Sequence, residues 1–456
     1  MSNVLDLVDQ TAFLGERATR ATNLLHVVWV YNRAIDIDGL RDFHRHLQQG
    51  RLSRRIELSP LPFGRHRWVS ASDQPELEIE STPRPREDFD AWLEEQSNVS
   101  LDAEHGPGWH LAVLPFTDGG AGVSFVTSHC LTDGVGLCEA LADAASGSHD
   151  LIAWPAAGSR RRWQALREDA RQTVRDIPAM GRAVAAAVRF ARRDLGAEAS
   201  ATQPPTALRS PFAEPDERVS SPMATIFVDA DEWDARADAL RGTGNALLAG
   251  LAARLAERAG RVGADGLAIL AIPVNERVAG DTRANAITAV DITVDPATAT
   301  TDLRAIRAAL KHELVRRQAV PDERWALLPL SPLMPQWLVR RMASVALGGA
   351  TTSGSSNLGA LNPAANRPDG TDADQFAMRT LYPGVTKATM DHTGGMLGLL
   401  SGRVHGKVFV SVYTYQPGRL NSDGDLRDDL AGALSDFSLS ATVGWGCPMP
   451  VGTARQ

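Results

Sequence analysis

Apolar residues recur with two different spacings along the first half of the chain. The run LLHVVWVYN at 24–32 is rich in β-formers and predicts a strand, and helical spacing predicts a helix over 36–49. Two further apolar runs, 110–116 and 121–129, flank the turn-rich TDGG and predict a hairpin, which a helix over 135–146 follows. This alternation predicts a mixed α/β (α+β) layer structure.

The second half repeats this mixed order after a segment of different character. Residues 160–193 are rich in arginine and have helical spacing, whereas 198–222 are rich in proline and serine, which is typical of a linker. We predict an N-terminal domain over 1–154, a helical connector and linker over 155–222, and a C-terminal domain over 223–456.

The bulk composition fits this picture. A chain of 456 residues is about right for two domains, and 43% hydrophobic with 22% charged residues is normal for a globular protein. A formal net charge of -8 argues against nucleic acid as a partner. The three cysteines, Cys130, Cys138 and Cys447, have no metal-ligand spacing. Because the N-terminus lacks a signal pattern and no apolar run reaches about 18 residues, we expect a cytoplasmic protein.

The segment SFVTSHCLTDGVGLCEAL carries the candidate chemistry. His129 ends an apolar strand, Asp133 and Gly134 follow in a turn, and an amphipathic helix comes next. A neutral histidine can accept a proton as a general base, and a strand end is a fixed platform for it. Gly134 permits a close backbone approach, and Asp133 can accept bonds from backbone N–H groups or an arginine. The pattern alone leaves open that His129 is a histidine in an ordinary turn.

The sequence resembles the HxxxD(G) acyltransferase superfamily over most of its length. That group includes condensation domains, wax ester synthase/diacylglycerol acyltransferases, polyketide-associated acyltransferases and chloramphenicol acetyltransferase. Segments that occur in the family's order are LDLVDQTAFL, GPGWHLAVLP, SHCLTDGVGL, GTGNALLAGLAARLAERAG, AILAIPVNERVAGDTRANAITAV, TSGSSNLGALNP and VFVSVYTYQPGRL. The resemblance implies two chloramphenicol-acetyltransferase-like mixed-sheet domains that form a pseudo-symmetric V with a central tunnel.

The resemblance assigns roles to individual residues. His129 matches the catalytic base, and Asp133 and Gly134 match the structural pair. Arg277 matches an arginine that pairs with the aspartate in some relatives. Ser128 stands where many condensation domains and wax ester synthases have a second histidine, which weakens a close assignment to wax ester synthases.

Five further residues are candidates for contact with substrate. Ser355, Ser356 and Asn357 match a segment that passes the active centre from the second domain, where Ser355 and Asn357 could donate to an oxyanion. The same residue types also favour turns, so that role stays open. Trp109 and His392, with Ser128, are candidates to line the tunnel, although a core tryptophan and a loop histidine are the plainer interpretations.

The function expected from the resemblance is transfer of an acyl group from acyl-CoA or an acyl-carrier protein to a hydroxyl, with no bound cofactor or metal. Amide formation by a stand-alone condensation enzyme is the alternative reaction, and a non-catalytic binding module of the same fold is an alternative of another class. We expect a monomer. The arginine-rich segment 160–193 is best explained as a solvated helix face. Peripheral contact with an anionic membrane is a second use for it, and contact with coenzyme A phosphates or a carrier protein is a third.

Overall fold

The computed structural model describes most of the chain. The described residues are 3–19, 21–71, 75–147, 152–198, 217–278, 280–319, 325–335, 338–339 and 352–446, without the side chains of 190–198. Most of the predicted linker, and Cys447, lie outside these ranges.

The first sheet has five strands in the order β11-β1-β6-β5-β4. All neighbours in it are antiparallel except β4 and β5, which are parallel. The strands are β11 (Gln375–Leu381), β1 (Leu24–Tyr31), β6 (Ala121–Ser128), β5 (Trp109–Pro115) and β4 (Leu77–Ile79). The predicted hairpin is therefore present as β5 and β6.

The second sheet has seven strands in the order β14-β7-β13-β12-β10-β8-β9. Strand β10 is parallel to both of its neighbours, and the other pairs are antiparallel. The strands are β14 (Thr442–Val443), β7 (Met223–Asp229), β13 (Lys407–Tyr415), β12 (Met396–Val404), β10 (Thr352–Ala360), β8 (Ala268–Asn275) and β9 (Ile287–Val294). A small antiparallel pair, β2 (Arg54–Glu57) and β3 (Arg67–Ser70), lies apart from both sheets.

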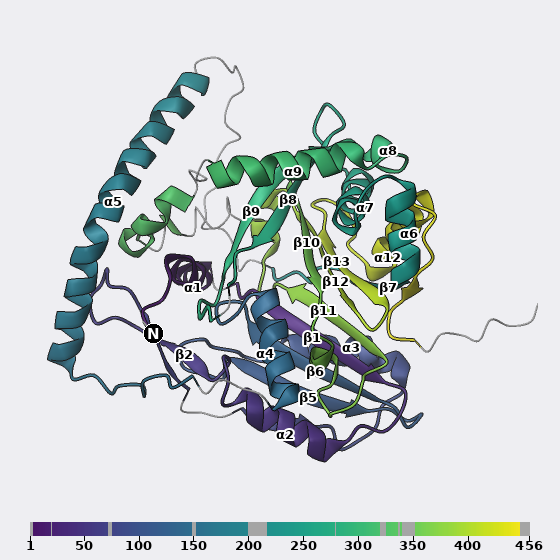
Figure 1. Cartoon of the computed structure of the whole chain (residues 1–456), viewed down its shortest axis with the longest axis horizontal. Coiled ribbons are helices and arrows are strands. Elements are labelled where there is room, and N and C mark those ends of the chain that lie inside the picture. Colours follow the sequence, from purple (N-terminus) through teal and green to yellow (C-terminus); the bar gives the residue numbers. More distant parts are fainter. Residues whose placement is uncertain are drawn as a thin grey trace, which may run out of the picture.

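Helices cover both sheets (Figure 1). The first sheet packs against α2 (Ile37–Leu47), α4 (Gly134–Ser146) and η3 (Pro363–Asn366) on one face and against η1 (Arg86–Asp88) and α3 (Phe89–Ser97) on the other. The second sheet packs against α6 (Ala230–Ala239), α7 (Gly244–Arg258), α8 (Pro296–Ala299), α9 (Arg304–Ala319) and α12 (Asp423–Asp436). The other described helices are α1 (Leu7–Thr19), α5 (Arg162–Glu198), η2 (Trp325–Leu333) and α11 (Lys387–Thr393).

The molecule has two lobes, each made of one large sheet and the helices that cover it, and strand β11 joins them. It comes from the range predicted as the C-terminal domain, yet it forms the edge of the first sheet beside β1. It also packs against β12 and β13 of the second sheet, where the rings of Phe376 and Phe409 lie 5.7 Å apart. The core of the first sheet therefore extends to one face of the second sheet, whose other face packs in a separate core with its own helices. The expected fold class, with two mixed sheets, is confirmed.

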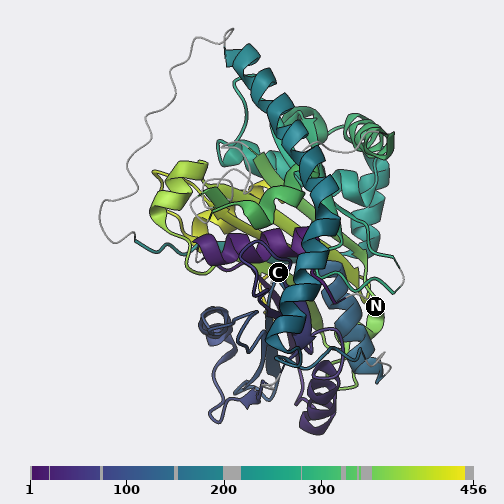
Figure 2. The same ribbon diagram turned by 90° about the vertical axis from the view of Figure 1, so that its left-hand side faces the viewer.

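Helix α5 runs as a single helix along the outside of the molecule, through Pro178 (Figure 2). It packs against η2, which in turn contacts α1. Among the described helices, none is both long and apolar enough to cross a membrane.

Candidate functional site

His129 lies in the turn directly after β6, and its backbone is fixed from two sides. Its N–H donates to the carbonyl of Asn23 at 2.8 Å, and its carbonyl accepts from the Asn285 side-chain amide at 3.1 Å. The side chain is partly exposed. Within the described ranges the imidazole has no hydrogen-bond or ion-pair partner. Both ring nitrogens are thus free for a substrate.

Asp133 turns away from His129 and holds the start of α4. Its Oδ1 accepts from the N–H of Gly136 at 2.7 Å, which is an N-cap bond. Its Oδ2 accepts from Arg277 Nη2 at 2.7 Å and from the N–H of Ala286 at 2.8 Å. The side chains of Asp133 and Arg277 are 1% and 3% exposed, so this is a buried ion pair between the two lobes.

The described parts of the β8–β9 loop, residues 276–278 and 280–286, pack against the turn that carries His129. Asp133 N–H donates to the carbonyl of Ala284 at 2.9 Å, and Arg277 Nη2 donates to the same carbonyl at 2.9 Å. From the other side, Arg54 donates to the carbonyls of Leu131, at 2.7 Å, and Thr282. The turn is therefore built by side chains from both halves of the chain.

Asp9 on α1 anchors the tip of this loop. Its carboxylate accepts from the N–H groups of Ala284 and Asn285 at 3.0 and 2.7 Å, and from the Asn285 amide at 3.2 Å. Burial raises the pKa of the Asp9 carboxyl to about 6, although the nearby Arg54 opposes this shift. Because Asn285 also holds the His129 carbonyl, Asp9 positions the turn through one intermediate residue.

Glu16, also on α1, contacts the residues on either side of His129. Its Oε2 accepts from Cys130 Sγ at 3.2 Å and from Ser128 Oγ at 3.5 Å. Burial raises the pKa of Glu16 to about 7, and the two donors only partly offset this effect. A carboxyl that changes charge near neutral pH therefore lies against the turn that carries the histidine.

Two glycines at the start of α4, Gly134 and Gly136, leave space that side chains of the second lobe occupy. A Cβ on Gly134 would lie 2.8 Å from Leu358 Cδ2, and a Cβ on Gly136 would lie 2.9 Å from Arg277 Nη2. Gly136 is thus needed for the ion pair of Asp133 and Arg277. Leu358 belongs to β10, so the strand that carries the serine-rich segment passes the start of α4.

The predicted oxyanion donors on β10 are in unequal environments. Ser355 is buried, Ser356 is partly buried, and Asn357 is exposed. The Asn357 side chain is already engaged, because its amide nitrogen donates to Asn245 and its oxygen accepts from Gly359 N–H at 2.8 Å. Ser356 remains as a candidate donor on the side of the first sheet. Ser355 lies in register with Leu399, whose side chain packs under the helices of the second sheet, so Ser355 faces that core, and Asn357 would have to break its two bonds first.

The three tunnel candidates lie in three different places. Trp109 is 2% exposed, stacks on Phe125 at 5.5 Å and donates to the carbonyl of Leu52, so it belongs to the core of the first lobe. Ser128 is fully buried beside Glu16. His392 is exposed on α11. The central tunnel itself stays a prediction.

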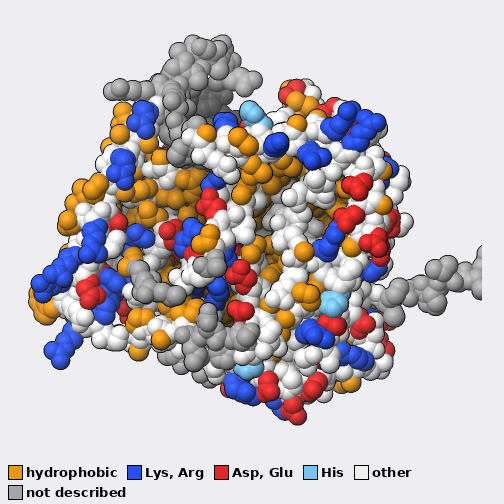
Figure 3. Space-filling view, viewed as in Figure 1, with side chains coloured by type: hydrophobic (Ala, Val, Ile, Leu, Met, Phe, Trp, Pro, Cys, Tyr) orange, Lys and Arg blue, Asp and Glu red, His pale blue; other side chains and the backbone are white. Residues whose placement is uncertain are grey.

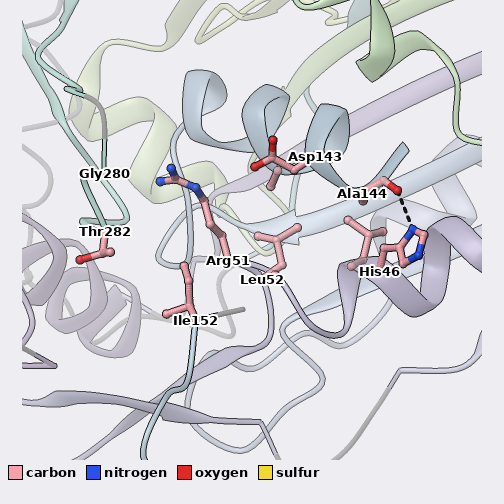
Figure 4. A pocket seen from close by; sticks show the side chains of 11 residues that line it. His46, Arg51, Leu52, Asp143, Ala144, Ile152, Gly280 and Thr282 are labelled. Carbon is pink, nitrogen blue, oxygen red and sulfur yellow. Dashed lines mark hydrogen bonds between the residues drawn. The ribbon is translucent and has the colours of Figure 1, made fainter. Parts of the chain in front are cut away.

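A pocket opens between α2, the C-terminal half of α4 and the β8–β9 loop (Figure 4). Its volume is about 580 Å³, which includes space open to solvent. His46 lines it and donates from Nδ1 to the carbonyl of Ala144 at 2.8 Å. No residue of the turn 129–133, which carries His129, lines this pocket. Within the part of the chain that is described, no group of three His, Cys, Asp or Glu side chains could hold a metal ion.

Several residues of the site were not singled out from the sequence. Asp9, Glu16 and Arg54 carry no pattern that marks them, although Asp9 lies in the quoted segment LDLVDQTAFL. Asn285 likewise lies in a quoted segment, AILAIPVNERVAGDTRANAITAV. Their place in segments that resemble the family is a sequence signal for these two residues, but it does not show what either of them binds.

Comparison with known proteins identifies the fold. No family model and no curated protein matches the sequence. The structure is similar to that of polyketide synthase associated protein 5 from Mycobacterium tuberculosis, with a TM-score of 0.54 and 15% identity over 92% of this chain and 96% of that one. The first condensation domain of the CDA synthetase matches with a TM-score of 0.55 and 13% identity over 96% of each chain. The chain has the condensation-domain fold.

A third similar structure is the trichothecene 15-O-acetyltransferase from Fusarium sporotrichioides. It has a TM-score of 0.55 and 11% identity, over 94% of this chain and 93% of that one. Identities this low show a common fold and leave the reaction open, because one fold supports several functions. The reaction of this chain therefore depends on the residues of its own site.

Proposed function

We propose that this chain is an acyltransferase in which His129 is the general base for transfer of an acyl group from a thioester to a hydroxyl. The observation that carries the proposal is the environment of His129. Asn23 and Asn285 hold its backbone, while its ring is partly exposed and unpaired within the described ranges. A pre-positioned, unpaired imidazole is what general-base catalysis requires. The fold similarity to an O-acetyltransferase supports the same reaction class.

In this proposal a neutral imidazole nitrogen of His129 accepts the hydroxyl proton as the oxygen attacks the thioester carbonyl. The tetrahedral intermediate collapses, the C–S bond breaks, and the imidazolium returns the proton to the thiolate. The products are an ester and a free thiol, and no covalent acyl-enzyme forms. Ser356 is the candidate side-chain donor for the oxyanion.

The donor would be acyl-CoA or the thioester of an acyl-carrier protein. Amide formation is the second candidate reaction, because condensation domains share this fold and an amine could replace the hydroxyl at the same base. The third candidate is a binding module that has kept the fold and lost the reaction. Product mass separates the first two, and thiol release separates both from the third.

The test is release of free thiol from a panel of acyl-CoAs mixed with alcohols and amines. His129→Ala should lower the rate by about 10²–10⁴-fold and leave the melting temperature unchanged, since the ring has no partner to lose among the described residues. His312→Ala, on the exposed surface of α9, is the matched control and should behave as wild type. Wild-type rates in the His129 variant would refute the assignment. Absence of thiol release with every pair would favour the binding module.

A further inference from the structure

The face of α5 that contacts the body of the protein carries small and acidic side chains. Asp169, 1% exposed, pairs with Arg67 and Arg160, each at 2.9 Å, and Asp176 lies 3.7 Å from Arg65. Buried alanines on this face are Ala165, Ala183 and Ala186. The acidic side chains nearest the body are thus neutralised by arginines of the body, which ties the helix to the rest of the molecule.

The opposite side of α5 presents an exposed apolar stripe. At about 100° of rotation per residue, five large apolar side chains fall within an arc of about 80°. They extend over about 37 Å, or seven turns. These side chains are 45% to 83% exposed, and they are Trp163, Val174, Ile177, Val184 and Val188. Five large exposed apolar side chains on one helix face are unusual on the surface of a globular protein.

An arginine row follows one edge of this stripe. Five exposed arginines occupy the adjacent arc of about 80°, and none forms an ion pair with another described residue. They are Arg167, Arg171, Arg175, Arg182 and Arg189. Figure 3 shows Lys and Arg side chains interleaved with hydrophobic ones along the margin where α5 runs. The arginines therefore lie beside the apolar residues, along one edge of the stripe.

We propose that α5 docks on an anionic membrane surface, with its apolar stripe at the headgroup–acyl boundary and its arginine row against the lipid phosphates. The charge of the helix face is complementary to such a surface, while the whole chain carries -8. A lone helix of a carrier protein would cover only part of a straight stripe seven turns long, whereas a bilayer surface covers all of it. An exposed tryptophan at one end also fits the interfacial region. This inference does not depend on the acyl-transfer reaction.

The test is co-sedimentation of the full chain with vesicles. We expect binding to phosphatidylcholine vesicles that contain about a third phosphatidylglycerol, little binding to pure phosphatidylcholine, and weakening with salt. Arg171→Gln/Arg175→Gln/Arg182→Gln should lower partitioning on the order of a hundredfold, at about fivefold per arginine. These side chains are exposed, so this variant should keep its far-UV circular dichroism and melting temperature.

The apolar stripe is tested separately. Ile177→Asp/Val184→Asp should abolish sedimentation with the anionic vesicles. Leu420→Asp is the matched control, because Leu420 is 86% exposed and lies outside α5. If the folded wild type does not bind anionic vesicles, the proposal is overturned. It is also overturned if the triple arginine variant and the double stripe variant both bind as wild type does. Binding of purified acyl-carrier protein that both variants lose, without any vesicle binding, would assign the surface to a protein partner instead.

Discussion

Replacing Asp133 with alanine removes three hydrogen bonds of 2.7–2.8 Å at the junction of the lobes. Loss of the N-cap bond to Gly136 costs about 1 kcal/mol. The larger loss comes from Arg277, which is 3% exposed and would remain buried without a carboxylate. Removal of one partner from such a pair costs about 3–5 kcal/mol. Arg277 keeps bonds to the carbonyls of Arg283 and Ala284, so we expect a total near the lower end of about 4–6 kcal/mol.

Asp133→Asn keeps the shape of the side chain but replaces one acceptor oxygen with an amide N–H₂. If the amide oxygen still caps α4, the N–H₂ lies against Arg277 Nη2 and the N–H of Ala286, which are donors too, so the cost should not be smaller than that of Asp133→Ala. Urea unfolding followed by far-UV circular dichroism measures both, with His129→Ala as a control that should lose less than about 0.5 kcal/mol. If Asp133→Ala unfolds within about 1 kcal/mol of wild type, the pair does not stabilise the junction. A clearly smaller loss in Asp133→Asn would show that the bonds to Oδ2 contribute little.

Two further predictions concern the supports of the histidine turn. Because burial raises the pKa of Glu16 from 4.5 to about 7, the free energy of unfolding should fall as pH rises from about 4.5 to about 7, by about 1.4 kcal/mol per pH unit, and level off above about pH 8. Thermal melts of Glu16→Gln should lack this dependence, and a wild-type melt that is flat over that window would contradict the shift. Asn285→Ala removes the bond to the His129 carbonyl, so thiol release should fall about tenfold or more while the helical circular dichroism persists. Unchanged turnover would show that Asn285 does not position the base.

Local patterns in the sequence predict the elements that pair with chain neighbours. The hairpin of β5 and β6 follows from two apolar runs around a turn, and α4 follows from the spacing after His129. Strand β11 does not follow in this way, because its partner β1 lies 353 positions earlier at the His26–Arg379 contact. Its residues QFAMRTL have no polar alternation, since both faces of this part of the sheet are covered. Only the assembled fold makes that segment an edge strand.

The candidate site likewise has residues that a local sequence motif marks and residues that only the fold brings to it. His129, Asp133 and Gly134 form a short motif, and the resemblance, not spacing, pointed to Arg277, 144 positions away from Asp133. Asn285 could not be predicted, because it acts on a backbone carbonyl, and a bond of that kind leaves no mark in residue type.

A second histidine in the first sheet shows why the environment of His129 is informative. His26 on β1 is fully buried, and both of its ring nitrogens are engaged, by Ser124 Oγ at 2.9 Å and by Arg379 at 3.3 Å. Burial holds the pKa of His26 well below its ordinary value, so this ring stays neutral and structural. His129 has the opposite arrangement, with a fully bonded backbone and a ring that no described residue engages. A structural histidine has hydrogen-bond partners at both ring nitrogens, whereas a general base needs a ring nitrogen that is available to the substrate, and of these two histidines His129 is the one that meets the second condition.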